Sequence, residues 1–157
     1  MKKQAYKMEY LRPVTEKAAV MLVSYVPKYQ EQYKRMYNAC YRKMREALDI
    51  RPYDLIQDDS FFSNGMNNVY LLVKDEELIG SVALKGSEID DLIVAPGFQN
   101  KGYGKQILLW ALENIKSEKI ILHVAQWNRK AISLYERNGF EITETFEISS
   151  QITADIS

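Results

Sequence analysis

The order of the hydrophobic patterns predicts a single α/β (α+β) domain with a mixed central β-sheet of six to seven strands flanked by helices. Short apolar or alternating runs between turn residues indicate the strands, and apolar residues at three- and four-residue spacing indicate helices. The 157 residues are 46% hydrophobic and 27% charged, which is typical of a globular domain with one core. We therefore expect residues 1–157 to form one domain.

The first half of the sequence predicts one strand, one long helix and a hairpin. Tyr6–Leu11 is expected to be a strand that ends before Pro13, because proline cannot donate to a sheet. A helical region begins at Pro27, which fits a first helical turn, and ends near Leu48, before Arg51-Pro52. Two β-rich runs, 69–73 and 78–84, flank a charged turn and predict a hairpin.

The second half predicts alternating strands and helices without a linker or an internal repeat. The expected ranges are strand 88–94, helix 104–116, strand 120–124, helix 129–138, and closing strands 140–142 and 145–152. Gly139 is placed to terminate the second of these helices. Together with the hairpin, the strand at 88–94 completes a meander of three consecutive strands.

The composition excludes several classes of protein. The sequence has one cysteine, Cys40, and one histidine, His123, so neither a disulfide framework nor a Cys/His zinc site can be built, and we expect no metal. The longest apolar runs, 18–23 and 107–112, are six residues each. A bilayer span needs about 20 residues, so we expect a cytoplasmic protein with no membrane partner.

The net charge is zero but unevenly distributed. Residues 1–51 carry 12 Lys/Arg against 5 Asp/Glu, whereas residues 52–157 carry 9 against 16. A basic surface near an acidic one suits an anionic cofactor or a cationic substrate, although a solvated helix beside acidic turns is the more economical interpretation. A nucleic-acid binder is the weakest hypothesis, because no aromatic or basic recognition motif supports it, and we expect no nucleic-acid partner.

A glycine-rich loop runs from the end of the strand at 88–94 into the helix at 104–116. Glycines allow close backbone approach to a phosphate, and the unpaired N–H groups of the first helical turn point at it. The loop is not a Walker loop, because Gly102 is followed by Tyr103 rather than lysine. It is not a dinucleotide fingerprint either, because Ile107 occupies the third glycine position.

The loop resembles the Gln/Arg-x-x-Gly-x-Gly motif of the GNAT (GCN5-related N-acetyltransferase) superfamily, here at residues 99–104. The second signature of that family, Asn-x-x-Ala-x-x-Leu-Tyr-x-x-x-Gly-Phe, is matched without a gap by Asn128, Ala131, Leu134, Tyr135, Gly139 and Phe140. Two motifs in the expected order, on the predicted strands and helices, make residues 69–142 similar to this family.

The resemblance implies that acetyl-CoA is the acyl donor. It implies a sheet splayed between strands 88–94 and 120–124, with the pantetheine arm lying in that gap like an added strand. The implied contacts are the backbone of Leu92, Ile93 and Val94 for the arm, and Gln99, Asn100, Lys101, Gly102, Tyr103, Gly104 and Lys105 for the pyrophosphate.

The resemblance also suggests catalytic roles. Tyr135 occupies the position whose phenol protonates the departing sulfur in relatives, and Asn128 occupies one that bonds the cofactor arm; a core tyrosine and a helix cap are the structural alternatives. Glu88 lies eleven residues before Gln99, where the histone-acetyltransferase branch has its base. A solvated carboxylate is equally consistent with Glu88, and many relatives use no dedicated base. Strand alternation places Glu88 and Asp90 on one face and Asp91 on the other.

Candidates for binding the acceptor are Tyr29, Tyr33, Asp90 and His123. Tyrosines recur at every fourth residue from 25 to 41, and such a row drifts around a helix by about 40° per step, so some phenols are expected to reach a groove or solvent. They could form an aromatic wall that grips a cationic amine, although core tyrosines with exposed hydroxyls are favoured. For His123 a structural role is favoured over that of a base.

The sequence therefore predicts an acetyl-CoA-dependent N-acetyltransferase that acts by direct transfer in a ternary complex. The acceptor is expected to be a primary amine, either a small cationic molecule or a peptide amine, and the protein a monomer or a homodimer. Another acyl-CoA or another nucleophile is an alternative on the same scaffold. A non-catalytic acyl-CoA-binding regulatory module, in which residues 99–104 function but Tyr135 and Glu88 do not, is an alternative of a different class.

Overall fold

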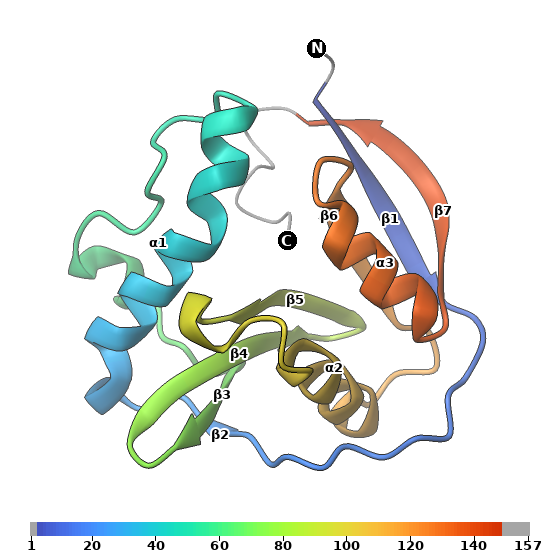
Figure 1. Cartoon of the computed structure of the whole chain (residues 1–157), viewed down its shortest axis with the longest axis horizontal. Coiled ribbons are helices and arrows are strands. Elements are labelled where there is room, and N and C mark those ends of the chain that lie inside the picture. The colour runs from blue at the N-terminus through green and yellow to red at the C-terminus, as the bar shows by residue number, and fades with distance from the viewer. Residues whose placement is uncertain (1–2, 149–157) are drawn as a thin grey trace.

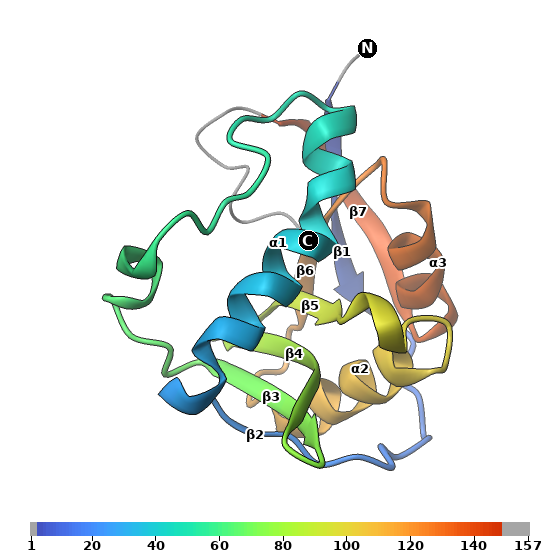
Figure 2. The ribbon, with the colours of Figure 1, turned by 60° about the vertical axis from the view of Figure 1, so that its left-hand side comes forward.

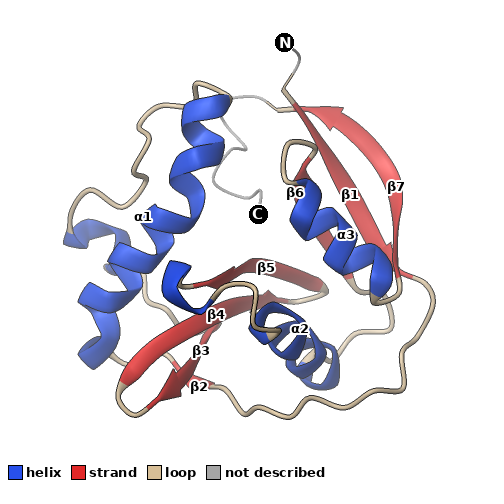
Figure 3. Ribbon diagram, in the orientation of Figure 1, coloured by secondary structure: helices blue, strands red, loops and turns tan. Residues whose placement is uncertain are grey.

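The computed structural model describes residues 3–148, which form a seven-stranded sheet in the order β2-β3-β4-β5-β6-β1-β7 (Figure 1). The strands are β1 (Gln4–Tyr10), β2 (Val23–Ser24), β3 (Val69–Lys74), β4 (Glu77–Lys85), β5 (Glu88–Val94), β6 (Ile121–Ala125) and β7 (Phe140–Glu147). The α-helices are α1 (Gln30–Ala47), α2 (Tyr103–Asn114) and α3 (Arg129–Arg137). Figure 3 shows how these helices and strands alternate. The predicted fold class, a mixed sheet flanked by helices, is confirmed.

Strands β3, β4 and β5 form the predicted antiparallel meander. The β3–β4 turn places Asp75 and Glu76 at positive φ, 51° and 63°. A two-residue turn with both φ values positive matches the right-handed twist of the strands, which explains why the hairpin closes so tightly around two charged residues.

The sheet opens between β5 and β6. Among the described residues these parallel strands pair only at Glu88 and Ile121, whereas β6 pairs with β1 from Ala5–Ala125 to Glu9–Ile121. Figure 1 shows the group β6-β1-β7 running at a steep angle to β3, β4 and β5. The splay predicted between strands 88–94 and 120–124 is therefore confirmed, and it leaves one edge of β5 without a neighbouring strand.

The helices cover opposite faces of the sheet, as the turned view in Figure 2 shows. Helix α1 packs against one face through a tyrosine-rich core, and α2 and α3 pack against the other through aliphatic residues such as Ile107, Leu108 and Ile132. Gly80 on β4 permits the close approach of α2, because a Cβ there would lie 2.6 Å from Ile107 Cδ1. None of the helices in the described part of the chain is long and apolar enough to cross a membrane.

The structure also contains elements that periodicity did not predict. Strand β2 is two residues long and pairs with β3, and three short 3-10 helices lie at Pro27–Tyr29 (η1), Asp59–Phe62 (η2) and Pro96–Phe98 (η3). The two predicted closing strands are one strand, β7, whose register against β1 shifts between Lys7 and Met8. Residues 149–152 of the predicted last strand lie outside the described residues.

Candidate active site

The loop between β5 and α2 forms the anion site that the sequence predicts. It contains left-handed backbone at Asn100, with φ 64°, and at Gly102, with φ 87°. No side chain of the described residues caps α2, which begins at Tyr103. Because the first N–H groups of a helix lack intrahelical acceptors, these groups are available to an anion, with the positive end of the helix dipole behind them.

A cavity of about 740 Å³ extends from this loop into the splay between β5 and β6. Its walls contain most of the residues predicted to bind the donor: Leu92, Ile93, Val94, Gln99, Asn100, Gly102, Tyr103, Gly104, Lys105, Asn128 and Tyr135. Lys101 lies outside this set of described residues, and its ammonium is 5.8 Å from the ring centre of Phe98. The splay and the glycine-rich loop therefore belong to one continuous site.

Sequence reasoning missed several residues of the cavity wall. They are Cys40, Tyr41, Phe98, Trp127, Lys130, Ala131, Leu134, Arg137 and Asn138. Ala131 and Leu134 lie within the second motif, which could have signalled them, and Tyr41 belongs to the four-residue row of tyrosines. Cys40 and Tyr41 come from α1, so their place depends on how that helix packs against the sheet.

The free edge of β5 presents main-chain groups to the cavity. The Ala95 N–H donates to the Ile79 carbonyl on β4 at 2.8 Å. Because successive amides of a strand point to opposite edges, the Val94 N–H points into the splay. The Val94 carbonyl accepts from Gln99 Nε2 at 2.9 Å and from the Cys40 thiol at 3.1 Å. Gln99 therefore ties the loop to the strand end, and burial raises the pKa of Cys40 to about 11, which keeps it a thiol.

Helix α3 supplies Tyr135 and begins at Asn128. Tyr135 is 2% exposed, and its ring lies 5.9 Å from that of Phe140. Burial raises the pKa of this phenol above its ordinary value, so it retains its proton. The Asn128 side chain accepts from the Ala131 N–H at 3.2 Å and so caps the helix, which is its structural alternative.

Cationic side chains lie at the loop end of the cavity. Lys130 Nζ donates to Asn100 Oδ1, Lys105 pairs with Glu16 at 2.9 Å, and Arg137 donates to Ser133 Oγ at 2.7 Å. All three residues line the cavity, so their positive charges would stabilise an anionic group bound there.

Glu88 and His123 face each other across the point where β5 and β6 still pair. His123 Nδ1 lies 3.0 Å from Glu88 Oε2, and this hydrogen bond raises the pKa of His123 above 6.5. Among the described residues that line the cavity, neither of these two residues nor Asp90 is present. Asp90 is 1% exposed and pairs with Lys85 Nζ at 2.8 Å.

Asp91 is turned by a β-bulge. The β4–β5 register shifts between Ser81 and Ala83, and Asp91 has φ 46°. The extra residue cancels the alternation of the strand, so the side chain of Asp91 faces α1, where Oδ1 accepts from the hydroxyls of Tyr41 at 2.8 Å and Tyr37 at 3.4 Å. The prediction that Asp91 lies on the opposite face of the strand from Glu88 and Asp90 is therefore wrong. Burial, and next the charge of Asp90, raises the pKa of Asp91 to about 7.

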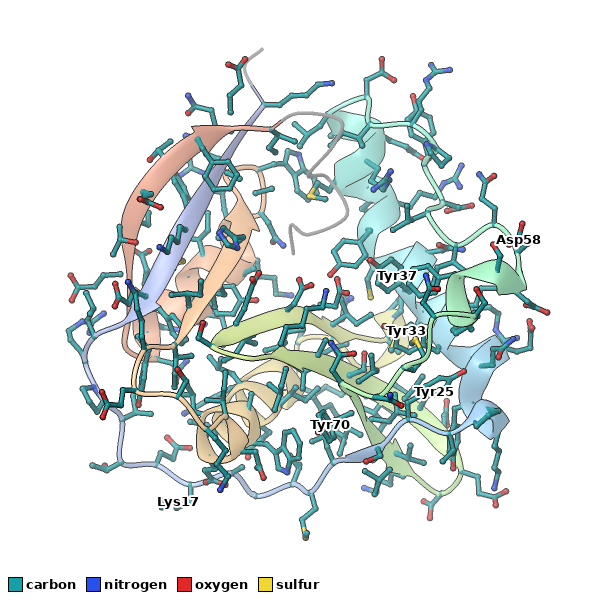
Figure 4. The ribbon with its side chains drawn as sticks, turned by 180° about the vertical axis from the view of Figure 1, so that it is seen from behind. Lys17, Tyr25, Tyr33, Tyr37, Asp58 and Tyr70 are labelled. Carbon is teal, nitrogen blue, oxygen red and sulfur yellow. The ribbon has the colours of Figure 1, made fainter. Side chains whose placement is uncertain are left out.

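Tyr29 and Tyr33, predicted to bind the acceptor, lie in the core between α1 and the sheet. Their exposed fractions are 9% and 1%, and neither belongs to the described cavity wall. Figure 4 shows Tyr25, Tyr33 and Tyr37 gathered beside α1, where Tyr25 and Tyr33 meet edge to face at 6.0 Å. Most of the tyrosines that recur at every fourth residue from 25 to 41 are therefore core residues. Among the described residues, Tyr41 is the one tyrosine of this row that lines the cavity.

Comparison with protein families decides the identity of this fold. A family model described as "Acetyltransferase (GNAT) family" matches residues 31–140. The chain belongs to the GNAT acetyltransferase family. The matched segment contains both motifs and every described residue of the cavity wall, from Cys40 to Asn138.

Solved structures of GNAT proteins share the fold at low sequence identity. An acetyltransferase from Colwellia psychrerythraea has a TM-score of 0.68 and 11% identity over 94% of this chain and 57% of its own. A GNAT-family protein from Novosphingobium aromaticivorans has a TM-score of 0.66 and 16% identity, over 92% and 62%. YjaB from Escherichia coli, in its apo form, has a TM-score of 0.58 and 16% identity, over 80% and 84%. The chain therefore spans about 60% of the length of the first two. No curated protein matches the sequence.

Among the described residues, no group of three or more His, Cys, Asp or Glu side chains is placed to hold a metal ion.

Proposed function

We propose that this GNAT protein is an acetyl-CoA-dependent N-acetyltransferase that transfers the acetyl group directly to a primary amine in a ternary complex. One observation carries the proposal: a single cavity joins the uncapped N-terminus of α2, the free edge of β5 and the buried phenol of Tyr135. An anion-binding end, an edge for an extended arm and a proton donor are the three features that the transfer needs.

The residues of the cavity fit the donor. The N–H groups at the start of α2 and the charges of Lys105, Lys130 and Arg137 suit a pyrophosphate and a further phosphate. The Val94 N–H, which points into the splay, suits the amides of a pantetheine arm. A bound donor supplies the activated acetyl thioester, and the binding residues fix its position.

Tyr135 is the proposed acid. Its phenol keeps its proton because burial raises its pKa, and it lies in the wall of the cavity, so it can protonate the departing sulfur. Glu88, the base that the sequence spacing suggests, is hydrogen-bonded to His123 and does not line the cavity, so the proposal does not depend on it as the base. The carboxylates of Asp90 and Asp91 on the α1 side of the sheet favour a cationic acceptor, a small amine or a peptide amine.

Donor binding is tested by calorimetric titration with acetyl-CoA and with CoA. Gly102→Val is expected to weaken binding at least tenfold, because φ 87° strains any residue with a Cβ. Gly97→Val is the control, since its Cβ would meet nothing within 4 Å and Gly97 does not have positive φ. Absence of binding to the native protein would contradict the proposal.

The catalytic role is tested with Tyr135→Phe. This variant is expected to retain its affinity for CoA and to lose about 100-fold in turnover, a typical contribution of one acid or base. Retained affinity with no turnover in the native protein, over a panel of primary amines, would instead support the non-catalytic acyl-CoA-binding module.

A further inference from the structure

We infer that Tyr41 and Asp91 form a proton relay that removes a proton from the acceptor amine and stores it behind the cavity wall. The inference rests on the proposed acetyltransferase function. It assigns the base to a pair of residues, one on α1 and one on the bulge of β5, that neither sequence motif contains.

Tyr41 connects the cavity to Asp91. Tyr41 lines the cavity together with Leu92, the residue that follows Asp91. Its hydroxyl donates to Asp91 Oδ1 at 2.8 Å, a distance typical of a strong hydrogen bond to a carboxylate. A proton that reaches the phenol oxygen from the cavity can therefore displace the phenol proton onto Asp91.

The bulge of β5 gives Asp91 this position. In a regular strand Asp91 would face the α2 side of the sheet, but at φ 46° it turns to α1 and accepts from both Tyr41 and Tyr37. Such positions are unfavourable for residues other than glycine and concentrate at functional sites. The backbone conformation of Asp91 is therefore a second indication of a functional role, independent of its hydrogen bonds.

The charged and titratable groups around Asp91 come from every element packed against it. Tyr37 and Tyr41 of α1 bond to it, and it interacts electrostatically with Tyr33 of α1, Asp90 of β5, Lys85 of β4 and Tyr135 of α3. Burial and Asp90 raise its pKa to about 7, whereas the tyrosine hydrogen bonds and Lys85 oppose the rise. A carboxylate with this pKa accepts a proton from an ammonium near neutral pH and releases it again to solvent.

The proton balance of the step is simple. An N–H bond of the acceptor ammonium breaks as its proton moves to Tyr41 Oη. At the same time the original O–H bond of Tyr41 breaks, and the phenol proton moves to Asp91 Oδ1. The products are a neutral amine, an intact phenol and a neutral Asp91. The amine lone pair is then free to attack the thioester carbonyl, and Tyr135 protonates the departing sulfur.

The test compares variants in the rate of CoA release as a function of pH from 5 to 9. The amines are 1,4-diaminobutane and phenylalanine amide, as a small cationic acceptor and a peptide-type acceptor. Tyr41→Phe and Asp91→Asn are each expected to lower kcat about 100-fold and to retain the affinity for CoA. Both variants should also lose the fall in rate below about pH 7, the acidic limb of the pH–rate profile.

Tyr37→Phe is the matched variant, because it removes a phenol that bonds the same oxygen but lies outside the described cavity wall. Losing this donor raises the pKa of Asp91, so the acidic limb is expected to move to higher pH while the plateau persists. Equal losses in Tyr37→Phe and Tyr41→Phe would overturn the relay. A loss of the limb in Glu88→Gln that exceeds the loss in Tyr41→Phe would overturn it too, in favour of Glu88 as the base.

A second measurement does not depend on turnover. The ¹³C resonances of Tyr41 Cζ and Asp91 Cγ are expected to titrate together near pH 7, and Tyr41 Cζ should lose this titration in Asp91→Asn. Independent titration of the two carbons would overturn the relay even if both amines are acetylated. Absence of acetylation in every protein, with the joint titration intact, would count against the proposed function and leave the relay pair standing.

Discussion

At the scale of single residues, two titratable groups on the α1 side of the sheet have raised pKa values for different physical reasons. Asp91 owes its raised pKa first to burial, whereas His123 owes its raised pKa first to a hydrogen bond with Glu88. Burial penalises the charged carboxylate, and the bond favours the charged imidazole. The two pKa values therefore shift in the same direction, one because the charged form is disfavoured and the other because it is favoured.

The His123 shift predicts the effect of Glu88→Gln. Loss of the carboxylate removes the main cause of the shift, so the pKa of His123 is expected to fall. A raised folded-state pKa stabilises the native state below about pH 6.5, and this contribution disappears as the pH rises through the folded-state value. The variant should lose that pH dependence. An NMR titration measures the pKa directly, because His123 is the single histidine of the sequence; an unchanged pKa would contradict the role of Glu88.

Residue by residue, the sequence predicted best where chemistry is local. Tyr135, Asn128 and Gly102 each belong to one of the two short family motifs, and all three line the cavity. The positions of Asp91 and Tyr41 at the site could not be predicted. A bulge cancels the strand alternation at Asp91, and the face that α1 turns to the sheet decides whether Tyr41 reaches the cavity. Neither displacement leaves a periodic signal in the chain.

At the scale of elements, the packing of α2 against β4 and β5 positions the anion-binding loop. Gly80 is the point of closest approach, where a Cβ would lie 2.6 Å from Ile107 Cδ1 and 2.7 Å from the Ile93 carbonyl. The Ile107 side chain can move, but the carbonyl belongs to the neighbouring strand and cannot move alone. A Cβ at Gly80 would therefore displace the Ile107 side chain of α2 and force a shift in the backbone of β5.

Gly80→Ala is expected to destabilise the protein by about 2 kcal/mol, the usual cost of overpacking a close contact. Urea denaturation measures this change. Gly97→Ala is the control and should lie within about 0.5 kcal/mol of the native protein, because its Cβ would meet nothing within 4 Å. Equal stability of the two variants would mean that α2 shifts freely on the sheet.

At the scale of the whole molecule, the sheet consists of two groups of strands that hardly pair with each other. Strands β2 to β5 form one group and β6, β1 and β7 the other, with the pair Glu88–Ile121 between them. The sequence predicted this opening through its family resemblance. It could not predict β2, whose two residues depend wholly on β3 for their definition.

The uneven charge also finds its explanation at this scale. Cations of the first third pair with acids of the remainder, as in Lys28–Glu76, Lys7–Glu144 and Arg12–Glu141. These pairs are largely exposed, so each contributes little to stability. Part of the positive charge of the first third is therefore paired with acidic side chains from the rest of the chain.

A ligand in the cavity touches β5 in one group of strands and, in the other group, helix α3, which connects β6 to β7. This position predicts its effect on stability. Acetyl-CoA at about 100 times its Kd should raise the free energy of unfolding by about 2.7 kcal/mol. Hydrogen exchange should slow in both β5 and α3, because the ligand bridges them. Thermal denaturation and exchange mass spectrometry measure these effects, and protection confined to one group would place the ligand elsewhere.

The position of β1 between β6 and β7 has a consequence for the nascent chain. Residues 4–10 leave the ribosome more than a hundred residues before both of their partners, and at about 5–20 residues per second the wait lasts on the order of ten seconds. The β3–β5 meander has all its strands long before then. Translation therefore delivers a completed half-sheet first, and the earliest strand to be synthesised is among the last to find its place.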